Sequence, residues 1–265
     1  MKKKVKLPVI LLIIFVSFLL LAPHGNYLKT DVINTFASPS REHWMGTDNL
    51  GRDVYSLLIA GGIRTLEVVF IATLISFFAG TLMGMTAGYY GGIFGSIIQF
   101  ISDFSLVIPS FIVALTISAL FGFNVIMAGI VFGIGQMGEY VNQAFVLTRS
   151  LKSQEFIDAE LVLGLSRPRI IFFHVFPNIC SQLLVFMGNK AANVVNLYAG
   201  LAFIGLGTDI TNPDWGTLLY QYRSYMTTYP VLVMWPALFI AILTICLHLT
   251  FDSSKIEKGN LTLYD

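Results

Sequence analysis

Charged side chains are scarce in this sequence. Asp, Glu, Lys and Arg make up only 12% of the 265 residues, and the formal net charge is +1. This balance gives no reason to expect nucleic acid as a partner. The two cysteines, Cys180 and Cys246, both lie in apolar segments that we place in the cytosolic half. We therefore expect neither a structural disulfide nor a cysteine metal site.

Sequence motifs of enzymes are also missing. There is no Gly-rich phosphate loop ending in Lys-Ser/Thr, no Gly-x-Ser-x-Gly and no His-Glu-x-x-His. The four histidines lie far apart and show no metal-ligand spacing. We therefore expect a non-catalytic chain with no metal and no cofactor of its own.

Hydrophobic residues dominate instead, at 55% of the chain, with a mean hydropathy of +0.75. These values are typical of an all-α polytopic membrane protein embedded in a lipid bilayer. Six transmembrane helices are predicted, over residues 7–22, 66–90, 95–121, 124–147, 180–207 and 231–251. The first run is also compatible with a cleavable signal, but the spans that follow favour a retained anchor.

The six predicted transmembrane helices divide the chain into three parts. Residues 1–22 form the N-terminal cytosolic end and first span, 23–65 an extracytoplasmic segment, and 66–265 a five-span core with a cytosolic tail, 252–265. Ten of the sixteen Lys and Arg residues then fall on the side of the termini and of the polar loop 149–178. The positive-inside rule accordingly places both termini in the cytosol.

The polar loop 149–178 predicts a short helix, a turn and a second helix. Ser153 can cap the first helix, whose first turn carries Glu155 and Asp158, and Gly164 ends it.

The second helix of this loop begins at a Ser166 cap and ends at Pro177, with Arg167 and Arg169 exposed. An amphipathic hairpin of this kind fits either a groove on a soluble partner or the lipid surface.

The loop resembles the Glu-Ala-Ala loop of ABC-importer permeases. Asp158, Ala159 and Glu160 stand for the triplet, Gly164 for the glycine that follows, and Phe176 with Pro177 for the closing pair. Asp replaces Glu at 158, and Glu160 adds a charge where the family has alanine. The resemblance implies docking on a cytosolic ATPase through Glu155, Asp158, Ala159, Gly164, Arg167 and Pro177.

Two further motifs narrow the resemblance to the C-type permease of dipeptide, oligopeptide and nickel importers. The first is GTDNLGRD, with Thr47, Asp48, Gly51, Arg52 and Asp53; the second is AFIGLG followed by NPDWG, with Phe203, Gly205, Gly207, Pro213, Trp215 and Gly216. The first motif either contacts a binding protein or sister permease, or forms an internal cap. We favour the cap, in which Asp48 and Asp53 satisfy Arg52 and nearby backbone amides.

Small and helix-breaking residues in the spans point to close packing and a kink. Gly80, Gly84 and Gly88 lie on one helix face and indicate close helix packing. Pro109 predicts a kink in the third span and Pro236 a break in the sixth.

Polar residues within the spans are the candidates for a translocation pathway. Asp103 is either a gate or interfacial, and Glu139 shares a face with Asn142 and Gln143. Lys190 needs a counter-charge, for which Glu139 or Asp103 is available. The remaining candidates are Asn189, Asn193 and Asn196, which either bind across to the sister permease or line the pathway, and helix-to-helix bonding by amides favours the first.

The resemblance implies a type I ABC importer permease. Its partners would be a sister B-type permease in a heterodimer, two cytosolic ATPases that hold ATP and magnesium, and an extracytoplasmic solute-binding protein. For the substrate we favour nickel or a metal chelate, with di- and oligopeptides as the alternative. A function of another class is a membrane receptor or scaffold that moves no solute.

Overall fold

The computed structural model describes residues 2–122, 124–205 and 211–259, and these residues contain no β-strand. The long helices are α1 (Lys2–Leu21), α2 (Val54–Tyr90), α3 (Gly92–Val107), α4 (Ser110–Phe121), α5 (Val125–Lys152), α8 (Phe176–Phe203) and α10 (Pro230–Gly259). The short elements are η1 (Val32–Asn34), α6 (Glu155–Val162), α7 (Arg167–Arg169), the π-helix η2 (Ile170–Val175), α9 (Trp215–Tyr222) and η3 (Arg223–Tyr225).

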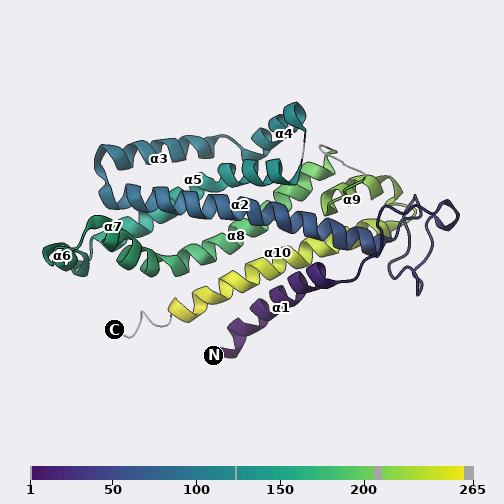
Figure 1. The fold of residues 1–265 in the computed structure, drawn as a ribbon, viewed down its shortest axis with the longest axis horizontal. Coiled ribbons are helices and arrows are strands. Elements are labelled where there is room, and N and C mark those ends of the chain that lie inside the picture. The colour runs from purple at the N-terminus through teal and green to yellow at the C-terminus, as the bar shows by residue number, and fades with distance from the viewer. Residues whose placement is uncertain (1, 123, 206–210, 260–265) are drawn as a thin grey trace.

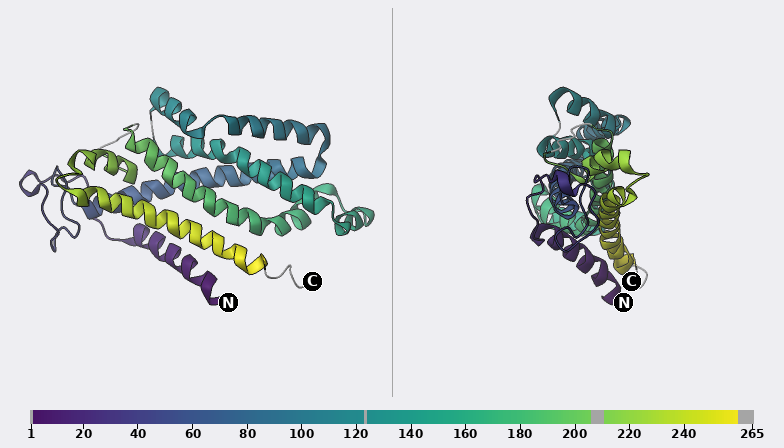
Figure 2. Two further views of the ribbon diagram at one scale, coloured as in Figure 1. Left: turned by 180° about the vertical axis from the view of Figure 1, so that it is seen from behind. Right: turned by 90° about the vertical axis from the view of Figure 1, so that its right-hand side faces the viewer.

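The long helices run side by side in one elongated bundle (Figure 1). Helix α6 projects from one end of the bundle, while α9 and the irregular segment before α2 lie at the other (Figures 1 and 2). The start of α1 and the last turns of α10 point toward the end that carries α6. The bundle therefore separates the polar loop from the extracytoplasmic motifs of the sequence.

Helix α2 runs through the middle of the bundle and packs most closely against α5. A Cβ atom built on Gly84 would lie 2.3 Å from the carbonyl oxygen of Val141, and one on Gly88 would lie 2.7 Å from that of Phe145. Only glycine permits this approach of two helix backbones. The predicted glycine stripe is thus confirmed as a packing surface, including Gly80, where an added Cβ atom would lie 2.6 Å from Tyr140 Cβ.

Fewer helices than expected have the length and composition of a membrane span. Within the described residues, three helices do so by themselves, over Val54–Tyr90, Arg167–Phe203 and Pro230–Phe251. The bent pair α3 and α4 makes up to four, and Leu7–Leu21 is a shorter apolar helix. Helix α5, the expected fourth span, carries the polar side chains Gln136, Glu139, Asn142 and Gln143 in its middle turns. The structure thus supports three or four of the six predicted spans by composition.

Several predicted boundaries are wrong. Helix α2 begins at Val54, twelve residues before position 66, because Asp53 caps it by accepting the Ser56 amide. The kink predicted at Pro109 in the third span is confirmed, because α3 and α4 meet there at a bend of 73°. Helix α10 continues through Pro236, where a break was predicted.

The predicted tail also differs from the structure. Helix α10 extends to Gly259, so residues 252–259 are helical where an irregular tail was expected, and 260–265 lie outside the described residues.

Candidate functional site

The polar loop after α5 forms a helix and a turn, as the sequence predicts, but with a different cap. Helix α6 starts after Gln154, and the Ser153 hydroxyl donates instead to the carbonyl of Ser150 at 2.8 Å. The predicted Ser153 cap is therefore wrong. Gly164, with φ of +84°, follows the last turn as expected, because the left-handed conformation it adopts favours glycine.

The second half of this loop is not a separate helix. Residues Arg167–Phe203 run as one helix, and Pro177 lies in the first turn of α8 rather than at an end. A π-helical stretch precedes it, in which the Phe176 amide bonds the carbonyl of Ile171, five residues earlier. This wider turn accommodates a proline that lacks an N–H donor. Ser166 is the N-cap of α7, but its side chain makes no capping bond.

Apolar and polar contacts fasten the loop to the bundle. Ile157 of α6 is fully buried and belongs to a core cluster that also contains Tyr89 of α2. The Lys152 ammonium donates to the Tyr89 carbonyl at 2.6 Å. Across the turn, His174 Nδ1 lies 2.5 Å from Glu160 Oε1, so the unusual charge at position 160 has a partner within the chain. These contacts link α6 to the ends of α2, α5 and α8.

The outer surface of the loop carries apolar side chains that are exposed rather than packed against the bundle. Val162 is 87% exposed and Leu163 is 77% exposed. We define the loop tip as the exposed apolar side chains Phe156, Leu161, Val162, Leu163, Phe172 and Phe173. The predicted coupling residues Glu155, Asp158, Ala159, Gly164, Arg167 and Pro177 are likewise exposed.

Two of the predicted polar residues form an ion pair between α5 and α8. Lys190 Nζ contacts Glu139 Oε2, and the same ammonium lies 5.2 Å from the centroid of the Phe186 ring. Asp103, the other proposed counter-charge, accepts a hydrogen bond from Asn142 Nδ2 at 2.8 Å. Of the two counter-charges predicted for Lys190, Glu139 is therefore the partner.

The asparagines of α8 divide between two environments. Asn189 Oδ1 lies 2.7 Å from His248 Nδ1, and Asn196 Oδ1 accepts from the Thr244 hydroxyl at 3.4 Å. These contacts bind α8 to α10 inside the same chain. Asn193 lies between them along the helix and is exposed.

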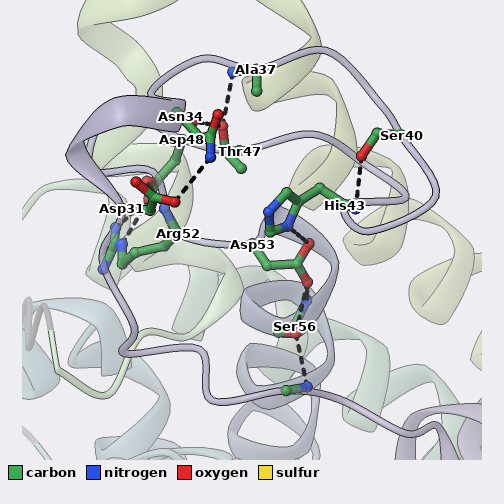
Figure 3. A network of polar contacts seen from close by, with 11 residues as sticks. Asp31, Asn34, Ala37, Ser40, His43, Thr47, Asp48, Arg52, Asp53 and Ser56 are labelled. Atoms are coloured by element: carbon green, nitrogen blue, oxygen red, sulfur yellow. Dashed lines mark hydrogen bonds and ion pairs between the residues drawn. The ribbon is translucent and has the colours of Figure 1, made fainter.

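At the other end of the bundle, the GTDNLGRD motif forms an internally bonded cap (Figure 3). Asp48 and Arg52 are buried, and Arg52 Nη2 lies 2.6 Å from Asp48 Oδ2. Asp48 Oδ1 accepts the backbone amides of Leu50 at 2.8 Å and Arg52 at 2.9 Å. Arg52 also reaches Gln221 of α9 at 2.8 Å. Asp48 therefore forms the internally bonded cap that we favoured from the sequence.

Asp53 accepts a nearby backbone amide, that of Ser56, as predicted, but it does not pair with Arg52. It caps α2 and lies 3.0 Å from His43 Nδ1 (Figure 3). Thr47 holds the preceding turn, because its hydroxyl accepts the Ala37 amide at 2.8 Å.

Gly51 and Tyr222 complete this cap. Gly51 has φ of +69°, and a Cβ atom there would lie 1.8 Å from the Asp31 carbonyl oxygen, so the turn requires glycine. The Tyr222 hydroxyl, at the end of α9, donates to Asp48 Oδ2 at 3.4 Å. Burial, and then the Asp48 charge, raise the pKa of this hydroxyl well above its ordinary value, so it stays a donor.

The second extracytoplasmic motif attaches α9 to the bundle. Pro213 is buried, and the Trp215 indole is fully buried and donates to the Leu58 carbonyl of α2 at 2.8 Å. A Cβ atom on Gly216 would lie 2.5 Å from the Ala199 carbonyl of α8. Phe203 and Gly205 close α8, and Gly207 lies outside the described residues.

Comparison with known proteins shows the family of this chain. The family model described as "Binding-protein-dependent transport system inner membrane component" matches residues 80–255. The chain belongs to this family. It is thus an inner-membrane permease subunit of an ABC importer, and the resemblance inferred from its motifs is confirmed.

Relatives are similar over most of their length. The dipeptide transport system permease protein DppC of Alkalihalophilus pseudofirmus is 32% identical over 96% of this chain and 85% of its own. The glutathione transport system permease protein GsiD of Escherichia coli is 33% identical, over 93% and 82% respectively. GsiD of Pectobacterium atrosepticum is 31% identical, over 87% and 76%.

The fold also has a solved counterpart. An inward-facing structure of the MetNI methionine ABC transporter matches with a TM-score of 0.56 and 16% identity, covering 77% of this chain and 95% of that one. At this identity the match supports the importer permease fold alone.

Some contacts of the permease could not be predicted from its sequence. The pair of Glu160 with His174 joins residues fourteen positions apart across a turn, and that of Asn189 with His248 joins residues of two helices. Neither spacing belongs to a local motif, so only the packing of the elements reveals them.

Proposed function

We propose that this permease imports di- or oligopeptides, in company with cytosolic ATPases and an extracytoplasmic binding protein. The relatives support this substrate class, because those named above are dipeptide and glutathione permeases. Nickel, which the sequence alone led us to favour, has no specific support from them. The peptide alternative therefore replaces it.

The observation that carries the coupling proposal is the exposed loop tip. Apolar side chains as exposed as Val162 and Leu163 mark an interaction surface when they gather at one end of a protein. The loop is also tied by Lys152 to the end of α2 and by His174 to the base of α8. In our proposal an ATPase subunit grips the tip, and its closure moves these helices.

The orientation follows from the same proposal. Arg149, Lys152, Arg167 and Arg169 lie in or beside the loop, on the side where the positive-inside rule expects basic residues. The loop and both termini then face the cytosol, and the cap around Asp48 faces outward. A sister permease would complete the pathway as a pseudo-twofold heterodimer.

The polar residues of α3, α5 and α8 are the proposed lining of that pathway. Charged and amide groups in a membrane bundle face protein or water rather than lipid. Asp103, Glu139, Lys190 and Asn193 keep exposed surface in this chain. Asn189 and Asn196 contribute by holding α8 against α10.

The test is reconstitution of the chain with the transport proteins encoded beside it. Val162→Glu places a charge on the loop tip, and we expect it to lower retention of the ATPase subunit and peptide-stimulated ATP hydrolysis by about tenfold or more. Ile33→Glu is the matched control, because Ile33 is 93% exposed and belongs to η1, in the irregular segment before α2 that lies at the opposite end of the bundle. It should leave ATPase retention unchanged.

Two results would contradict the proposal. Retention of the ATPase by Val162→Glu at the wild-type level would show that the tip is not the docking surface. An assembled wild-type complex that binds the ATPase but accumulates no peptide in vesicles would favour the scaffold function.

A further inference from the structure

An ion pair lies at mid-depth in the helical bundle. Glu139 and Lys190 each stand at the midpoint of a 28-residue helix, α5 and α8, and these helices lie next to each other (Figures 1 and 2). Charges at such a depth are costly unless they are paired and reached by water or protein. The packing of apolar helices therefore does not by itself explain why this pair is present.

The pair is open to one side of the chain. Its carboxylate side chain is 34% exposed and its ammonium side chain 18% exposed. The exposed Asn193, one turn from Lys190, extends the polar surface along α8. Asn142, one turn from Glu139, bonds Asp103 of α3 and links the pair to a second carboxylate. Hydrocarbon is a poor solvent for such a surface, so it faces a wet cavity or another protein chain.

We propose that Glu139 and Lys190 bind the two charged ends of a zwitterionic peptide as it crosses the membrane, an inference that rests on the proposed function. The ammonium of Lys190 would bind the peptide carboxylate, and the carboxylate of Glu139 would bind the peptide amino group. With no solute present, the two side chains neutralise each other, as they do in this structure.

This exchange selects for solutes that carry both charges. A solute with only a negative charge would pair with Lys190 and leave Glu139 without a partner at mid-depth. A solute with only a positive charge would do the reverse. Leaving one charge without a partner at this depth is unfavourable, whereas a zwitterion replaces both partners at once. The site thus disfavours anionic metal chelates and bare cations.

The experiment uses the complete complex in proteoliposomes, with the binding protein present. Uptake is compared for free dialanine, its C-terminal amide and its N-acetyl derivative, each at a concentration that saturates the binding protein in a separate titration. We expect the wild type to take up the free dipeptide about ten- to a hundredfold faster than either derivative.

Each variant should relax one half of this selectivity. Lys190→Gln should bring the amide to within about threefold of the free dipeptide and keep the discrimination against the N-acetyl form. Glu139→Gln should do the opposite. The double variant Glu139→Gln/Lys190→Gln retains a hydrogen-bonding pair without charge, so it should fold and should lose both preferences. Glu67→Gln removes an exposed carboxylate of α2 and is the control.

Three outcomes are distinguishable. Relaxed selectivity in the single variants supports the inference. Unchanged uptake ratios in them, with a lower thermal midpoint of unfolding, would overturn it and leave the pair a structural link between α5 and α8. A wild-type complex with no peptide uptake and no peptide-stimulated ATP hydrolysis would overturn the proposed function itself, and this inference with it.

Discussion

The buried pair of Asp48 and Arg52 allows a quantitative test of the extracytoplasmic cap. Both side chains are almost completely buried, at 0% and 2% exposure, so loss of the Asp48 charge removes a buried ion pair. Replacing Asp48 by Asn keeps an oxygen for the backbone amides but removes the charge. Breaking a buried pair costs about 3–5 kcal/mol. In a chain of this size we expect the thermal midpoint to fall by about 6–20 °C.

The neighbouring Asp53 is the matched control, because it lies in the same motif but does not pair with Arg52. Asp53 caps α2, and Asn is about as good an N-cap as Asp. Asp53→Asn should therefore change the free energy of unfolding by less than about 1 kcal/mol. Thermal unfolding of the purified complex, followed by the reactivity of Cys180 and Cys246 toward a thiol dye, measures both variants.

A particular result would refute this reasoning. If Asp48→Asn unfolds at the same temperature as Asp53→Asn, the buried pair does not hold the cap together. If Asp48→Asn also loses binding-protein docking without any shift in the midpoint, the motif is a contact surface rather than an internal structure.

Two further substitutions test how the helices pack. Gly84→Ala would place a Cβ atom 2.3 Å from the Val141 carbonyl oxygen, so α2 and α5 must separate, and we expect a loss of about 1–3 kcal/mol in unfolding measurements. Gly200→Ala, whose Cβ meets nothing closer than 3.9 Å, should be neutral or stabilising, and equal losses would contradict the packing argument. Trp215→Phe removes the indole donor to the Leu58 carbonyl, and should cost about 1–3 kcal/mol by the same assay. An unchanged midpoint would show that this bond does not anchor α9.

Family and helical class could be predicted because both depend on local patterns. The resemblance rests on three separated motifs, and the glycine stripe on α2 follows from the four-residue spacing of Gly80, Gly84 and Gly88. The sequence also limited the partner of Lys190 to two candidates, Glu139 and Asp103, since a charge at mid-depth requires an opposite one. The substrate was not determined in this way, because the same motifs occur in peptide and nickel importers.

Only the tertiary structure decided which of the possible partners meet. It pairs Lys190 with Glu139, turns Asn189 toward His248, and carries the helix through Pro177 by a π-helical turn. The first two contacts, Lys190 with Glu139 and Asn189 with His248, each join residues about fifty or more positions apart. Hydropathy and spacing describe one helix at a time, whereas the rotation of a helix about its axis is set by all the helices packed around it. The chain alone thus specified its helical class and its motifs, and packing specified where the helices begin and bend and how their polar side chains are used.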